Sequence, residues 1–86
     1  MLVHEKIELG VGHSIEFGGA TWDGNEASVR NRYLTADGKF SPHSSSELSL
    51  DDLTILIVES AARDIFKIPS IARMLTALSA SISRQA

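Results

Sequence analysis

The chain has 86 residues, with a hydrophobic content of 43% and a charged content of 22%, as in ordinary globular proteins. This length predicts a single domain over 1–86, which buries roughly 60–65% of the surface that the unfolded chain exposes. The absence of cysteine excludes a disulfide scaffold, and the net charge of −3 argues against a general nucleic-acid binder, which needs clustered Lys and Arg.

No apolar run approaches the ~18 residues that a membrane span needs. The start, Met1-Leu2-Val3-His4-Glu5, lacks the basic and then apolar order of a secretory signal. We therefore expect a soluble, cytoplasmic protein with no membrane partner.

The chain divides into two kinds of pattern. Residues 1–48 alternate between apolar and polar and contain Gly-rich turns, whereas residues 49–86 show helical periodicity interrupted at Ile68-Pro69. The pattern predicts an α+β fold: a small antiparallel sheet of two β-hairpins, with three or four strands, followed by a C-terminal two-helix hairpin packed on it.

The first hairpin is predicted to turn through Gly10-Val11-Gly12. This register places Leu9 opposite His13, Ile7 opposite Ile15 and Lys6 opposite Glu16, so that apolar residues and opposite charges pair. Trp22, between the later Gly-rich turns, is expected to cover one edge of the core.

The second hairpin is predicted to turn at Asp37-Gly38 in a type I′ turn, pairing 29–36 with 39–42. This register places Thr35 opposite Phe40, on the core-facing side with Val29. Pro42 lacks an N–H group, so the second strand is expected to lie at an edge or to end there. Ser44-Ser45-Ser46 is predicted to be a polar connection.

A first helix is predicted over about 50–66, with Ser49 as its N-cap and Asp52 completing an acidic capping box. The β-branched residues within 56–58 would also suit a strand, but the caps and the length favour a helix. Apolar residues occupy more than half of its circumference, so we expect it to be covered on more than one side. The second helix should start at Pro69 or Ser70.

The second helix combines an apolar stripe with a surface of small side chains. The small residues are Ala72, Thr76, Ser79, Ala80 and Ser83. Two interpretations stay open: an interface that another helix can approach closely, or a plain exposed Ser/Ala surface. The two helices also differ in charge, because acids dominate the first and the second carries only basic charges.

One basic cluster is a candidate anion site. Arg30 and Arg32 share a strand face, and the predicted hairpin adds Lys39 and His43 to it. Two guanidinium groups ~7 Å apart can bind a phosphate or carboxylate. The alternative is an outward face whose arginines pair with Asp23, Glu26 or Glu47.

Catalytic and metal sites are not predicted. His13 and Glu16 have a ligand-like spacing, but residues three apart in a strand point to opposite faces. The serines occupy cap, linker and terminal-helix positions, and no cofactor motif is present, so an enzyme with a site at His13 or His43 is the least favoured class.

The sequence thus predicts a small protein that works stoichiometrically through protein–protein contacts, as a homo-oligomer or as an accessory or inhibitor subunit of a larger partner. The alternative is a module that binds a small anion, a nucleotide or a local nucleic-acid segment through the basic strand face.

Overall fold

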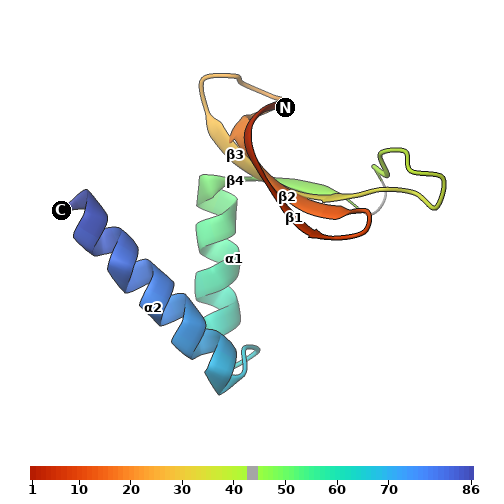
Figure 1. Ribbon diagram of the computed structural model, residues 1–86. Coiled ribbons are helices and arrows are strands. Elements are labelled where there is room, and N and C mark those ends of the chain that lie inside the picture. Colours follow the sequence, from red (N-terminus) through yellow and green to blue (C-terminus); the bar gives the residue numbers. More distant parts are fainter. Residues whose placement is uncertain (43–44) are drawn as a thin grey trace. The chain divides into compact units, whose positions relative to one another are not determined.

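The computed structural model describes residues 1–42 and 45–86 (Figure 1). A four-stranded antiparallel sheet is followed by two helices, so the α+β prediction is confirmed. The chain forms two compact units, Met1–Thr54 and Ile55–Ala86. The boundary between them lies inside the first helix, six residues after the predicted change from strands to helices. That the units make one domain stays a prediction.

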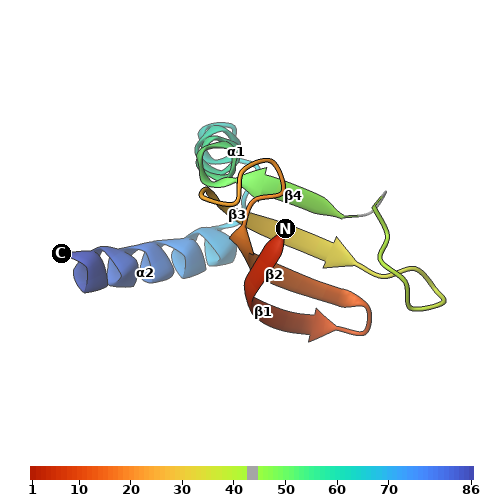
Figure 2. The ribbon, with the colours of Figure 1, turned by 90° about the horizontal axis from the view of Figure 1, so that it is seen from above.

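The sheet is a meander in the order β1-β2-β3-β4 (Figure 2). Its strands are β1 (Leu2–Gly10), β2 (His13–Gly19), β3 (Ala27–Tyr33) and β4 (Ser46–Ser49). β1 and β4 are therefore the two edges of the sheet, and β2 and β3 lie between them.

The β1–β2 hairpin has the predicted register over its centre, with Ile7 opposite Ile15 and Lys6 opposite Glu16. The turn itself differs from the prediction. Gly10, rather than Leu9, faces His13, because the register shifts between Glu8 and Gly10. Gly12 has φ 72°, a left-handed conformation that suits glycine, so Val11-Gly12 alone makes the turn and a bulge in β1 absorbs the extra residue.

The predicted second hairpin is wrong in two respects. β3 ends at Tyr33 and pairs with β4, whereas residues 39–42, all of them described, contribute one isolated bridge, Leu34 with Phe40. Phe40 therefore faces Leu34 and not Thr35. The cause is the turn: the Lys39 carbonyl accepts a hydrogen bond from the Thr35 amide at 2.6 Å, so the loop has three residues.

Gly38 has φ 85°, as in a three-residue hairpin loop that ends on a left-handed glycine. A two-residue type I′ loop would have paired Ala36 with Lys39. The additional loop residue shifts the register by one, and a shift of one residue moves a side chain to the other face of the strand.

The predicted polar connection at 44–46 is also corrected in part. Ser46 begins β4 and Ser45 precedes it, while Ser44 lies outside the described residues. The Ser45 hydroxyl accepts a hydrogen bond from the Tyr33 amide at 2.9 Å, so this serine is bound to the end of β3.

Register partners lie on the same face of an antiparallel sheet, so the two faces can be read from the pairing. One face carries the charged rows, and the other carries most of the apolar side chains, in the rows Ile7–Ile15–Asn31–Ser46 and Glu5–Phe17–Val29–Leu48. Among the described residues the buried ones are mostly polar: Ser14, Glu16, Ser28 and Ser41, with Gly19 and Ala20.

Trp22 does not cover the core as predicted. It is 50% exposed, and its indole N–H donates a hydrogen bond to Glu26 at 2.9 Å.

The helices are α1 (Leu50–Ala62) and α2 (Ile68–Gln85). The Asp52 amide donates to Ser49 Oγ at 3.1 Å, which confirms Ser49 as the N-cap. α1 ends four residues before the predicted limit, ahead of Asp64 with φ 56°. α2 begins at Ile68, one residue before the predicted start, and Pro69 lies in its first turn. The helical hairpin is open, since α1 and α2 diverge from the connection between them (Figure 1).

Candidate functional site

The basic face predicted from Arg30 and Arg32 exists, and a buried carboxylate lies within it. Glu16 on β2 faces Arg30 on β3. Arg30 Nε donates to Glu16 Oε1 at 2.7 Å, Arg30 Nη2 lies 2.6 Å from the same oxygen, and Arg32 Nε lies 3.7 Å from it. The Glu16 side chain is only 7% exposed, so this is a charge cluster largely removed from water.

Sequence reasoning missed Glu16 as the partner, and expected Asp23, Glu26 or Glu47 instead. The signal was present: Glu16 has the parity in β2 that places it on the same face as Lys6. A third strand pairing with β2 then brings Arg30 opposite Glu16.

Two rows of charge cross this face. The row Lys6–Glu16–Arg30–Glu47 alternates in sign across all four strands, and the row Glu8–Ser14–Arg32 lies beside it. Three basic groups thus share this face of the sheet with three acidic groups. A balanced face with a buried carboxylate at its centre does not favour an incoming anion, and anion binding at Arg30 and Arg32 stays a prediction.

The register shift at Gly38 changes which residues join the arginines. Phe40 comes to their face: the Arg30 and Arg32 guanidinium carbons lie 5.1 and 5.3 Å from its ring centre. Lys39 directly follows the three-residue loop, its side chain is 82% exposed, and its Nζ lies 3.9 Å from Asp37 Oδ2. His43, the fourth predicted member, lies outside the described residues.

A second polar cluster forms where the β2–β3 connection meets β4. Glu47 Oε2 accepts hydrogen bonds from the Thr21 amide and from Ser28 Oγ, both at 2.9 Å, and Glu47 Oε1 accepts one from Thr21 Oγ1 at 2.7 Å. Burial raises the pKa of Glu47, but the donors on Thr21 and Ser28 outweigh burial and hold the pKa below the ordinary value of 4.5. The sequence had suggested Glu47 as a possible partner of the arginines, and not as the acceptor of these hydrogen bonds.

His13 lies on the face opposite Glu16, as the strand parity predicted, with its ring satisfied. The ring stacks on Tyr33, with centres 4.2 Å apart, and Nε2 lies 2.5 Å from Asn31 Oδ1. These partners come from β3. Within residues 1–42 and 45–86, no group of three His, Cys, Asp or Glu side chains could hold a metal ion.

The second unit, Ile55–Ala86, is called the helical unit below. In it, the predicted small-residue surface of α2 is exposed along its whole length. Its members are Ala72, Thr76, Ser79, Ala80 and Ser83. The short side chains of Ala72, Thr76 and Ala80, with Arg73 and Ala77, line a hollow along this helix.

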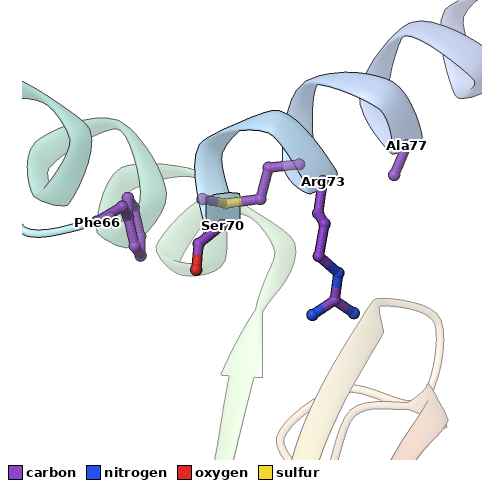
Figure 3. Close-up of a pocket in the computed structure, with 5 residues that line it drawn as sticks. Phe66, Ser70, Arg73 and Ala77 are labelled. Atoms are coloured by element: carbon purple, nitrogen blue, oxygen red, sulfur yellow. The ribbon is translucent and has the colours of Figure 1, made fainter. Parts of the chain in front are cut away.

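A second hollow, of about 420 Å³, lies where Phe66 meets the start of α2 (Figure 3). Ser70, Arg73, Met74 and Ala77 complete its lining. The volume is within the range of small-ligand sites. Arg73 is the one charged residue among those that line it, and no acid or histidine accompanies it, so the hollow lacks an acid–base pair.

Comparison with protein families, with curated proteins and with solved structures finds no match to this chain. Among the described residues, neither helix combines the length and apolarity that crossing a membrane requires. The residues themselves therefore carry the functional argument.

Proposed function

We propose that the protein acts stoichiometrically through protein–protein contacts made by its helical unit, as a homo-oligomer or as a subunit of a larger partner. One observation carries this proposal: every residue of α1 and α2 is described, and none is buried. Helices of 13 and 18 residues are marginal in water when nothing packs against them.

The apolar stripe of α2 is exposed as well. Ile68 is 82% exposed, Ile82 71% and Leu75 62%. Burying such a side chain stabilises a structure by about 1.5–3 kcal/mol, so a partner that covers this stripe has a large driving force. α1 shows the same feature at Ile55 and Val58, which are 57% and 56% exposed.

The small-residue surface of α2 adjoins the apolar stripe around the helix, since successive residues turn by about 100°. Alanine and serine allow a second helix to approach closely, while the neighbouring isoleucine and leucine side chains supply the apolar contact. We assign the contact to this combined surface. A cytoplasmic location remains part of the proposal.

The test compares the wild-type chain with Ala72→Arg, which inserts a long charged side chain into the small-residue surface. Ala77→Arg is the matched control, because it makes the same change about 140° around the helix from Ala72, on the side of Arg73 and Arg84 and outside the combined surface. Sedimentation equilibrium of the purified chain from low to high micromolar concentration measures self-association. We expect Ala72→Arg to reduce self-association at least tenfold and Ala77→Arg to leave it unchanged.

A chain that stays monomeric at high micromolar concentration refutes the homo-oligomer version. Amide hydrogen exchange then tests the partner version: without a partner, α2 should exchange within minutes. Strong protection of α2 amides in the monomer would show that the chain covers its own helix, and would overturn the proposal.

A further inference from the structure

The outer edge of β1 is the longest unpaired edge of the sheet. β1 has nine residues and pairs only with β2, and all nine are exposed. Such an edge presents free N–H and C=O groups to another strand. The other edge strand, β4, has four residues.

Two irregularities divide β1. The register with β2 shifts between Val3 and Glu5 and again between Glu8 and Gly10, so the regular stretch runs from Glu5 to Glu8. Bulges protect edges by bending them. They restrict any added strand to the four residues between them, and this makes the register of such a pairing easy to enumerate.

A second copy could pair with this stretch in antiparallel fashion about a two-fold axis at one of its four residues. An axis at Glu5, Lys6 or Glu8 places that residue opposite its own copy, with like charges facing each other, which destabilises a strand pair. An axis at Ile7 places Ile7 opposite Ile7 of the second copy. It also places Lys6 of each copy opposite Glu8 of the other, which makes two pairs of opposite charge. Of the four registers, only this one avoids facing like charges.

We propose that β1 pairs with β1 of a second copy in the register centred on Ile7. The pairing continues both patterns of the sheet. On the charged face, Arg30, Glu16 and Lys6 are followed by Glu8 of the second copy. The alternation of sign therefore extends across the contact between the two β1 strands, which we call the β1 seam. On the other face, Ile15 and Ile7 meet Ile7 and Ile15 of the second copy.

The alternative role for charged residues on an edge is to repel other strands. Here Lys6 Nζ and Glu8 Oε1 lie 3.0 Å apart in the same strand, with both side chains exposed. Each Lys6–Glu8 pair therefore presents both a positive and a negative charge. In the proposed register the two pairs form an alternating quartet of charges, which attracts a second copy rather than repelling it.

The test uses two variants that reverse one charge each. Lys6→Glu leaves only acids at positions 6 and 8, and Glu8→Lys leaves only bases there. Each variant by itself should associate about tenfold or more weakly than the wild type, because both ion pairs of the seam become repulsive. An equimolar mixture should recover association, since every facing pair is then Lys with Glu.

Sedimentation measures the association, and far-UV circular dichroism confirms that each variant is folded. Ile7→Cys gives a second readout: the chain has no other cysteine, and mild oxidation should join two copies through position 7. The matched control, Val11→Cys, lies in the turn outside the seam and should form far less of the disulfide.

Recovery of association only in the mixture, with selective cross-linking at position 7, supports the β1 seam. Association that does not respond to either charge reversal would overturn it, and would leave the helical unit as the contact. A failure of the mixture to exceed the separate variants would overturn it as well.

Discussion

The guanidinium carbon of Arg30 lies 5.1 Å from the ring centre of Phe40, and Arg32 lies at 5.3 Å from the same ring. The two arginines are thus held between an aromatic ring and the buried carboxylate of Glu16. Phe40 reaches this face because it pairs with Leu34. The three-residue loop that ends at Gly38 therefore decides the surroundings of both arginines.

Replacing Glu16 with Gln should destabilise the sheet by about 3 kcal/mol. The change leaves two partly buried guanidinium groups without a counter-charge, and unpaired charges of this kind are costly. Urea unfolding followed through the fluorescence of Trp22, the single tryptophan, measures the loss. Lys39→Gln is the control, because its ion pair with Asp37 is highly exposed and should contribute less than about 1 kcal/mol. Equal effects of the two changes would contradict the role of Glu16.

Gly38→Ala should destabilise the protein by about 1 kcal/mol, since alanine at φ 85° is strained. The control is Gly24→Ala. Neither glycine has an atom within 4 Å of an added Cβ, and the left-handed φ belongs to Gly38 alone of the two. The same unfolding measurement applies, and indistinguishable midpoints for the two variants would show that the loop is not held in this conformation.

Gly18→Ala should destabilise the protein more strongly, by about 2 kcal/mol or above, for a steric reason. An added Cβ would lie 1.8 Å from the Leu2 carbonyl oxygen, so the backbone of β1 must move. Gly10→Ala, with nothing within 4 Å of its Cβ, is the comparison. If Gly18→Ala unfolds at the same urea concentration as Gly10→Ala, the close approach of β1 and β2 at Val3 and Gly18 is wrong.

Glu47 should make the stability of the sheet depend on pH in the acid range. Its pKa in the folded chain lies below the ordinary value of 4.5. A lowered pKa means that the carboxylate stabilises the fold fully at pH values above 4.5, and that this contribution is lost as the pH falls through the folded-state pKa.

Thr21→Val tests this dependence because it removes the hydroxyl that donates to Glu47 Oε1. The pKa of Glu47 should rise toward its ordinary value, and the decline in stability on acidification should become shallower. Unfolding midpoints measured at a series of pH values from neutral to about 3 give the result. An unchanged pH dependence would mean that Thr21 does not hold the carboxylate.

Several elements could be predicted from local chemistry alone. The alternation in 2–17 and the glycine at the turn define the centre of the first hairpin, because only one register pairs Ile7 with Ile15 and Lys6 with Glu16. Ser49 caps α1 through its own side chain, and Pro69 suits a first helical turn. Each of these features depends on residues close in sequence.

Other features depended on contacts that the sequence does not display. The stretch containing Ser46 and Ser49 has the composition of a linker, yet it becomes β4, because β3 has a free edge that a short polar strand can pair with. Glu16 becomes the partner of Arg30 only when β3 pairs with β2. Glu47 was considered as a partner of the arginines, but β4 carries its carboxylate to Thr21 and Ser28.

The sequence by itself determined that strands precede two helices, the alternation of β1 and β2, and the starts of the helices near Ser49 and Pro69. These follow from backbone preferences and from pairing between near neighbours. Only the tertiary structure decided that Phe40 and Glu16 hold the arginines, because a one-residue change in a loop reverses the face of every residue that follows it. A two-residue loop and a three-residue loop both satisfy the local preferences at Asp37 and Gly38, and the pairing of distant strands selects between them.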